Sequence, residues 1–304
     1  MSISHYIKVI GRGKDGAKSI SREQASDLFG QVLDGAVTDL EIGAFCLAMR
    51  IKGETPEEMA GFLDATHARL HKVPTEGRTA VVLPSYNGAR KLPVLTPLLA
   101  LLLAREGLPV VVHGMATEST RVSAQNVLEA LDVPAQAAIE SIAPGTVQFV
   151  PTGLLCPGLQ HLLDVRRVVG LRNPAHSLVK LMNPCDHPAV VVGSYTHTEY
   201  AISMAATLRL VQATALLLRG TEGEPVADAR RTPTMDAFAD GEVTRVQEQQ
   251  EGSLANVPGL PTPDAPSTSA WIAAVLAGQE PIPAPIALQV AHIVQLSRQT
   301  RKTP

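Results

Sequence analysis

Residues 110–131 read VVVHGMATESTRVSAQNVLEAL: an apolar run, a His-Gly turn and then an amphipathic stretch. This order predicts a strand, a turn and a helix, the unit with which many α/β enzymes hold a phosphate group at a helix N-terminus. His113 and Gly114 supply the turn, and Ser119 and Arg121 lie farther along it. We expect His113 to be a buried histidine that hydrogen-bonds to backbone, which is commoner in such a turn than a catalytic group.

Basic residues gather in two short segments, although the chain carries a formal net charge of −3. Residues 8–22 hold five basic residues against Asp15, and residues 159–180 hold four against Asp164. Residues 221–251 run the other way, with eight acids against three arginines. A mildly acidic protein can therefore still present basic surface to phosphate groups. A solvated helix face is the plainer interpretation of either cluster taken alone.

Three capping boxes predict that the first 70 residues form a small helical unit. Ser21–Gln24, Thr38–Glu41 and Thr55–Glu58 each place a hydroxyl three residues before Glu or Gln, and apolar residues at helical spacing follow. Gly35 and Gly53 stand where helices should end. Three short helices bury little by themselves, so we expect one face to pack on the larger domain or on a second subunit.

From about residue 79 the pattern changes to short β-branched runs that alternate with helices, which predicts an α/β fold with a mostly parallel sheet. The expected strands are 79–83, 109–112, 147–150, 189–194 and 214–218, and the expected helices are 96–106, 123–131, 198–212, 268–277 and 285–298. Residues 157–183 also look helical. The predicted domains are therefore 1–75, joined by part of 157–183, and 76–304.

Composition describes an ordinary globular protein: 304 residues, 45% hydrophobic and 18% charged. The longest apolar candidate for a membrane span, 92–104, contains two prolines, and the N-terminus has no signal-peptide pattern. We therefore expect a cytoplasmic protein without a membrane partner. Cys46, Cys156 and Cys185 are too widely spaced for a disulfide framework or a zinc site.

Four segments carry a resemblance to a known family. These are TDLEIGAFCLAMRIKGETPEEMAGFLDAT (38–66), NVLEALDV (126–133), VRRVVGLRNPAHSLVKLMNP (165–184) and VVGSY (191–195). In order and spacing they resemble the anthranilate phosphoribosyltransferases of glycosyltransferase family 3 over nearly the whole chain. The resemblance implies a nucleoside phosphorylase/phosphoribosyltransferase-like fold, with a small helical domain and a large α/β domain. It also implies a homodimer formed through the helical domain and an active site in the cleft between the domains.

The loops that bind phosphoribosyl pyrophosphate in this family are replaced here. The first loop, G-T-G-G-D in the family, corresponds to Leu83–Asn87 followed by Gly88, and the later N-I-S-T corresponds to Pro93–Thr96. Pro84 and Pro93 each remove an amide donor. The family's K-H-G-N-R corresponds to Val112–Ala116, which lacks the lysine and the Asn-Arg pair. The positions left from this degenerate substrate site are Asn87, Gly88, Thr96, His113 and Gly114.

The family's magnesium ligands, D-G-L-D-E, correspond to Glu222–Val226 in this chain. Glu222 and Glu224 are weak candidates for a cation, because two surface acids without a phosphate partner are usually solvated. The loop, the lysine and the metal pair have all changed, so phosphoribosyl transfer should be severely impaired. We expect no catalytic residue and no cofactor; Mg²⁺ enters only if the protein is a transferase.

A divergent branch of the family, the YbiB-type DNA-binding proteins, resembles the replaced loops themselves. The shared segments are IGRGK (10–14), PSYNGARK (84–91), VVVHG (110–114), VLTPLLA (94–100) and RGTEGE (219–224). The resemblance implies a homodimer that binds single- or double-stranded DNA or RNA with little sequence preference. The candidate contacts are Arg90, Lys91, Arg166, Arg167, Arg172, Lys180 and Arg209, with Arg298, Arg301 and Lys302 as a weaker tail.

Three functions remain open on the sequence. The first is a nucleic-acid-binding homodimer without enzymatic activity, although helix 198–212 offers only Arg209 where a DNA-contacting helix should repeat Lys or Arg. The second is a glycosyl or phosphoribosyl transferase with altered substrates. The third is a structural or regulatory dimer that binds another protein. The aromatic content of 3% argues against base stacking as the main source of affinity.

Overall fold

The computed structural model describes residues 2–13, 15–250 and 259–300. Arg301 and Lys302 of the expected basic tail lie outside the described residues. The chain divides into two compact units. The helical unit comprises Met1–His71 and Thr152–Pro184, and the sheet unit comprises Lys72–Pro151 and Cys185–Pro304. The first boundary therefore falls after His71, where the sequence places it after residue 75.

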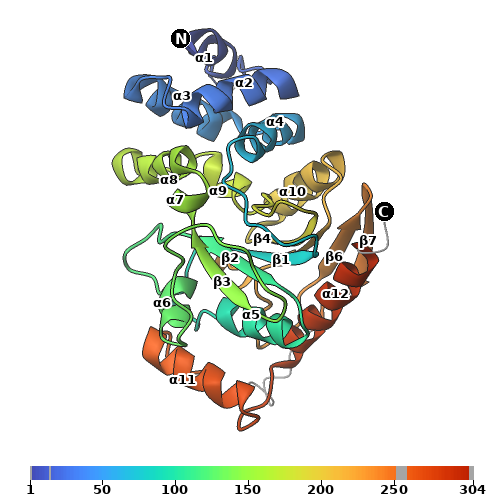
Figure 1. The fold of residues 1–304 in the computed structure, drawn as a ribbon. Helices are drawn as coiled ribbons and strands as arrows, with labels where there is room; N and C mark the ends of the chain where they lie inside the picture. Colours follow the sequence, from blue (N-terminus) through green and yellow to red (C-terminus); the bar gives the residue numbers. More distant parts are fainter. Residues whose placement is uncertain (1, 14, 251–258, 301–304) are drawn as a thin grey trace. The chain divides into compact units, whose positions relative to one another are not determined.

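The helical unit begins with α1 (Ser4–Ile10), α2 (Arg22–Leu33), α3 (Asp39–Lys52) and α4 (Pro56–His67), which Figure 1 draws in blue. The capping boxes predicted at Ser21, Thr38 and Thr55 are confirmed, with both reciprocal hydrogen bonds present in each. Helix α1 has no such signal and was not predicted. Phe29, Phe45 and Phe62 join α2, α3 and α4 in a buried aromatic core, and the Phe29 and Phe62 rings stack with centroids 4.7 Å apart.

Residues 152–184 add three more helices to this unit: α7 (Thr152–Leu155), α8 (Pro157–Val169) and α9 (Ala175–Leu178). The helical stretch expected over 157–183 is thus two helices with a break between them. Gly170 causes the break, because it caps α8 in the left-handed conformation, at φ 75°. Arg166 and Arg167 lie in the last turn of α8, where the helix dipole favours positive charge.

The sheet unit contains a seven-stranded sheet in the order β3-β2-β1-β4-β5-β6-β7. Strands β1 (Ala80–Ser85), β2 (Val110–Gly114), β3 (Val147–Pro151), β4 (Ala189–Tyr195) and β5 (Ala215–Arg219) are parallel, which confirms the predicted strands to within two residues at each end. Strands β6 (Met235–Ala239) and β7 (Glu242–Gln247) form an antiparallel hairpin. The hairpin lies in the acidic segment 221–251 and was missed.

Helices α5 (Thr96–Arg105), α6 (Ala124–Glu129), α10 (Thr198–Leu210), α11 (Ala265–Leu276) and α12 (Ala284–Thr300) complete the sheet unit (Figure 1). Alternate strand residues such as Leu83 and Val112 pack with Leu98 of α5 and Ile293 of α12 in one buried cluster. Helix α10 contacts β4, β5 and β6. Every residue of β1 and β2 is buried, as expected for central strands of a parallel sheet.

The parallel arrangement brings the carboxyl ends of β1, β2, β4 and β5 to one edge of the sheet, where ligands bind in open α/β folds. The loops that replace the family's substrate loops follow β1, β2 and β5 at this edge. Within the described residues, no helix combines the length and the apolar character needed to cross a membrane.

Candidate functional site

The loops after β1 and β5 meet around the carboxylate of Glu224, a residue that is 1% exposed. One carboxylate oxygen, Oε2, accepts hydrogen bonds from the hydroxyls of Ser85, at 2.5 Å, and Thr96, at 2.9 Å. The other oxygen, Oε1, accepts from the backbone amides of Asn87, at 2.9 Å, and Gly88, at 2.8 Å. Four donors of the degenerate phosphate loop therefore converge on a carboxylate of the same chain.

The neighbouring Glu222 extends this arrangement along the same loop. Its carboxylate accepts hydrogen bonds from the backbone amides of Arg90, at 2.5 Å, and Lys91, at 3.1 Å. Asn87 also donates from Nδ2 to the carbonyl oxygen of Glu222, at 3.1 Å. The Glu222 carboxylate thus binds Arg90 and Lys91, which lie in the sequence between Gly88 and Thr96, two of the residues that bind Glu224.

The expectation that both glutamates are solvated surface acids is wrong for Glu224. The two loops are far apart in the sequence, and the parallel sheet brings the ends of β1 and β5 to the same edge, on either side of β4. A signal was present: Ser85, Asn87 and Thr96 are donors in a loop that has kept no glycine-rich run. The described residues contain no group of three side chains able to hold a metal ion, and the Glu224 oxygens face N–H and O–H donors.

Glycines allow the backbone segments at this edge to approach closely. A Cβ on Gly114 would lie 1.9 Å from the carbonyl oxygen of Ser85, so only glycine fits at the end of β2. Gly88 has φ 63°, and a Cβ there would lie 2.7 Å from the carbonyl oxygen of Val122. Two of the positions retained from the family loops, Gly88 and Gly114, therefore have a structural reason that does not require a bound substrate.

His113 lies at the end of β2 and is completely buried. Its Nδ1 atom hydrogen-bonds to the hydroxyl of Tyr86 at 2.8 Å, so the expected bond to backbone is wrong. Burial lowers the pKa of His113 to about 3, which keeps the ring neutral at physiological pH. Its Nε2 has no hydrogen-bond partner among the described residues. The histidine is a packed residue of the sheet edge and has no access to a solvent-borne substrate.

Three of the basic residues predicted to contact phosphate belong to residues 152–184 of the helical unit. Arg166 of α8, Arg172 of the following loop and Lys180 after α9 all act electrostatically on His176 of α9. His176 is 9% exposed, and its pKa falls to about 4 through burial first and then through the positive charge of Arg172, Arg166 and Lys180. Its Nε2 also lacks a hydrogen-bond partner among the described residues. The structure therefore gathers positive charge around a neutral, buried histidine.

The other basic candidates are arranged differently. Arg167 is exposed on α8 and pairs with Asp164 at 3.1 Å. Arg90 and Lys91 belong to the sheet unit, and their backbone amides bind Glu222. Arg209 of α10 donates from Nε to the carbonyl oxygen of Gly241 at 3.2 Å. The predicted set thus forms one cluster in the helical unit and separate positions in the sheet unit.

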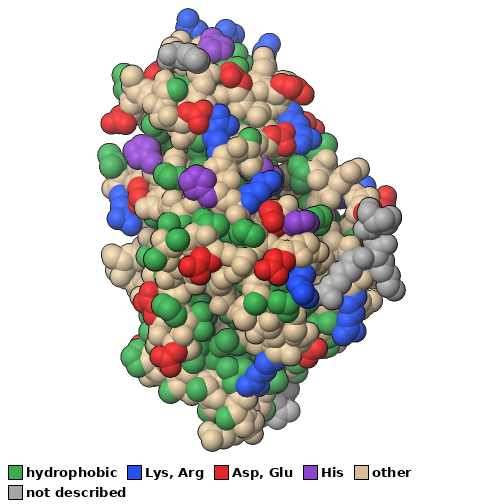
Figure 2. All heavy atoms as spheres, viewed as in Figure 1, with side chains coloured by type: hydrophobic (Ala, Val, Ile, Leu, Met, Phe, Trp, Pro, Cys, Tyr) green, Lys and Arg blue, Asp and Glu red, His purple; other side chains and the backbone are tan. Residues whose placement is uncertain are grey.

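Figure 2 shows one face of the molecule, on which the Lys and Arg side chains of each unit lie among Asp and Glu side chains.

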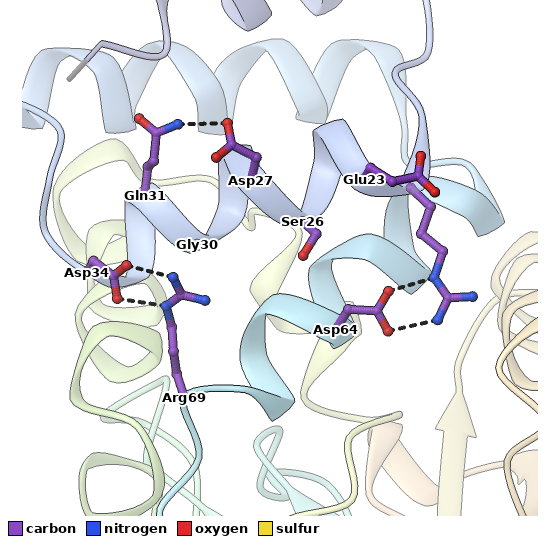
Figure 3. A pocket seen from close by; sticks show the side chains of 9 residues that line it. Glu23, Ser26, Asp27, Gly30, Gln31, Asp34, Asp64 and Arg69 are labelled. Carbon is purple, nitrogen blue, oxygen red and sulfur yellow. Dashed lines mark hydrogen bonds and ion pairs between the residues drawn. The ribbon is translucent and has the colours of Figure 1, made fainter.

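A polar groove of about 620 Å³ lies between α2 and α4 in the helical unit. Two bidentate ion pairs border it, Arg22 with Asp64 and Arg69 with Asp34, with N···O distances of 2.6–2.7 Å (Figure 3). Both arginines are thus neutralised by carboxylates, and the lining also contains Glu23 and Asp27. The excess of acidic groups makes this groove unsuitable for a phosphate backbone.

A second groove, of about 920 Å³, runs between α5 and α12 in the sheet unit. Its floor is apolar, with Leu102 of α5 and Val290 and Val294 of α12. Arg105 stands at its border and donates to the carbonyl oxygen of Leu276 at 2.6 Å. Neither groove was predicted, because each depends on how two helices pack against one another.

Comparisons with known proteins agree with this architecture. Residues 4–69 match the glycosyl transferase family, helical bundle domain. The uncharacterized protein YbiB of Escherichia coli is 40% identical over 301 residues, which cover 96% of this chain and 93% of that protein. The anthranilate phosphoribosyltransferase of Sorangium cellulosum is 30% identical over 86% of this chain and 77% of its own length.

Solved structures show the same fold. Anthranilate phosphoribosyltransferase from Thermus thermophilus superposes with a TM-score of 0.73 at 21% identity, over 97% of this chain and 93% of that one. The Saccharomyces cerevisiae enzyme, solved in complex with PRPP and Mg, gives 0.67 at 14% identity, over 98% of this chain and 89% of that one. Together with the relatives above, these matches place the chain in the anthranilate phosphoribosyltransferase-like glycosyl transferase family, in the branch that contains YbiB.

Proposed function

We propose that this protein binds DNA or RNA through the phosphate backbone, with little sequence preference, and does not transfer phosphoribosyl groups. The observation that carries the proposal is the position of Arg166, Arg172 and Lys180 on α8, on the loop after it and after α9 in the helical unit, where all three act electrostatically on the buried His176. Lys and Arg that neutralise phosphates release condensed counterions, and this supplies most of the affinity of sequence-independent binding. Because His176 is neutral, the positive charge of the cluster comes from the arginines and the lysine alone.

The hydrogen bonds of Glu224 within the chain argue against the transfer of phosphoribosyl groups. A phosphoribosyltransferase must offer an open phosphate loop and a metal-binding acid pair, whereas here the amides of Asn87 and Gly88 are bound to Glu224. Phosphoribosyl pyrophosphate would have to displace a buried carboxylate of like charge. The competing function, a glycosyl transferase with altered substrates, rests on the scaffold alone.

A second part of the proposal is a homodimer formed through the helical unit. On α3, Leu40, Leu47 and Ile51 are 83%, 47% and 55% exposed. Their spacing of seven and four residues places them on one face of the helix, with Gly43 and Ala44 between them. A second copy of this chain would bury this apolar stripe, and a dimer would also present the basic cluster twice, which raises the avidity for a polymer.

The test is fluorescence anisotropy with a labelled single-stranded DNA of about 30 nucleotides, as salt rises from 50 to 300 mM. We expect binding at 50 mM salt and a linear fall of log K with log salt. The variant Arg172→Gln/Lys180→Gln should bind at least about tenfold more weakly at 50 mM, with a slope reduced by about 1 for each lost phosphate contact.

The matched control is Arg230→Gln/Arg245→Gln, which removes the same charge from two arginines of the sheet unit, outside the cluster. It should bind DNA nearly as well as the wild type. Absence of binding at 50 mM salt contradicts the proposal, and so does an equal loss in both variants. A thermal shift with phosphoribosyl pyrophosphate and Mg²⁺ should show no stabilisation; a clear shift favours the transferase.

A further inference from the structure

We propose that residues 85–96 form a complete oxyanion-binding site whose resident ligand is the chain's own Glu224, and that a free tetrahedral oxyanion such as phosphate binds there once this carboxylate is removed. This loop lies at the sheet edge, and its binding of an anion does not depend on nucleic-acid binding. Glu224 acts as a built-in ligand that closes the site.

The donors at this site are arranged as anion sites in proteins usually are. Two consecutive backbone amides, those of Asn87 and Gly88, point at one carboxylate oxygen, and two hydroxyls, those of Ser85 and Thr96, point at the other. All four residues are buried. Each group donates a hydrogen bond without carrying a charge, so the site favours any compact anion with several acceptor oxygens. A tetrahedral oxyanion presents such oxygens in more directions than a carboxylate does.

The same loop offers a second pair of amides to Glu222. Arg90 and Lys91 donate to its carboxylate, immediately beyond the donors that hold Glu224. Donors therefore continue along the loop, and anionic oxygens occupy both places. The residues of the replaced loop have lost their glycine-rich sequence but keep the donors that an anion requires.

The backbone conformation of the segment after β5 holds the carboxylate of Glu224 against the donors. Glu222 has φ 52° and Gly223 has φ 90°, and a Cβ on Gly223 would lie 2.1 Å from Nδ2 of Asn87. A Cβ on Gly220 would lie 2.0 Å from the carbonyl oxygen of Glu224. Ser194 of β4 fixes the turn by donating to the carbonyl oxygen of Gly223 at 2.8 Å. Because Glu224 is tethered in this tight turn, its effective concentration at the donors is high and free anions cannot compete.

The experiment compares the thermal unfolding of wild type and Glu224→Ala in sodium phosphate and in sodium chloride of equal ionic strength. In chloride, Glu224→Ala should unfold at a lower temperature, because four buried donors lose their acceptor. Phosphate should raise the Tm of Glu224→Ala saturably, by about 5 °C near a hundredfold excess over Kd. The Tm of the wild type should rise only by the small, unsaturable increment that this excluded salt gives to folded proteins in general.

Two further variants make the outcome specific. Glu242→Ala removes one carboxylate from an exposed position on β7 and should respond to phosphate as the wild type does. Glu224→Ala/Thr96→Val removes one donor hydroxyl and should need more phosphate for the same shift. Should Glu224→Ala not fold in chloride, its soluble yield on refolding is measured instead, and phosphate must restore that yield.

Equal effects of phosphate on wild type and Glu224→Ala, or no effect on Glu224→Ala, would overturn the inference. DNA binding is measured in parallel on Glu224→Ala in chloride. It should be retained when that variant folds, so that a failure of the oxyanion site and a failure of the proposed function are told apart.

Discussion

The ammonium group of Lys52 lies 2.6 Å from the carboxylate of Glu58, and both side chains are buried. Lys52 ends α3 and Glu58 stands in the first turn of α4, so the pair joins two helices of the helical unit. Glu58 also accepts hydrogen bonds from the backbone amides of Ile20 and Thr55. One carboxylate thus fixes the chain before α2, the start of α4 and the end of α3.

Removing the charge of Glu58 should therefore lower the free energy of unfolding far more than removing the charge of a carboxylate in a solvent-exposed ion pair. We expect Glu58→Gln to lower the free energy of unfolding by about 3–5 kcal/mol, because Lys52 is left buried without its counter-ion. The control is Asp64→Asn, which breaks a pair with Arg22 whose side chains are 38% and 42% exposed and should cost about 1 kcal/mol or less. Urea unfolding at pH 7 measures both, and similar losses would contradict the prediction.

The buried histidines should make stability depend on pH. The folded-state pKa of His113, about 3, lies below the ordinary value of 6.5, so the unfolded chain takes up the proton first. This contribution is complete above pH 6.5 and is lost as pH falls towards 3, by about 2 kcal/mol at pH 5. His176, with a pKa of about 4, adds to it in the same direction.

The variant His113→Asn should show a shallower loss of stability between pH 7 and pH 5 than the wild type. Urea unfolding at intervals of half a pH unit measures the slope. An unchanged slope would mean that His113 takes up its proton without unfolding the chain. The range stops at pH 5 so that protonation of carboxylates contributes little.

The apolar stripe of α3 predicts that the oligomeric state depends on Leu47. We expect Leu47→Asp to convert the proposed dimer to a monomer in sedimentation velocity runs at micromolar concentration, because the stripe would then bury a charge. Ile202→Asp on α10 introduces the same charge at another exposed apolar position and should leave the proposed dimer intact. A dimer that survives Leu47→Asp would place the interface elsewhere.

The three cysteines should be unreactive in the folded protein. All are buried, and burial raises the pKa of Cys46 to about 11 and that of Cys185 to about 12, with Cys156 raised as well. Since the thiolate is the reactive form, Ellman's reagent should label none of them within minutes in buffer at pH 8, and all three in guanidinium. Rapid labelling of the native protein would show that a thiol becomes exposed.

Local signals explain which elements could be predicted. The capping boxes at Ser21, Thr38 and Thr55 act within four residues, so their sequence alone defines the helix starts. The parallel strands are continuous apolar runs because they are buried on both faces. The hairpin of β6 and β7 was missed because its residues are half-exposed and follow a run of acids, which resembles a solvated loop.

By itself, the sequence determined the two kinds of domain, the order of the parallel strands along the chain, and the replacement of the loops that hold phosphoribosyl pyrophosphate in the family. Only the tertiary structure showed that the loop after β1 binds the carboxylate of Glu224. Ser85 and Glu224 are 139 residues apart, and they meet only because β1 and β5 end at the same edge of the sheet. A buried carboxylate needs donors to replace its water, and the fold supplies them from the loop that corresponds to the family's phosphate loop.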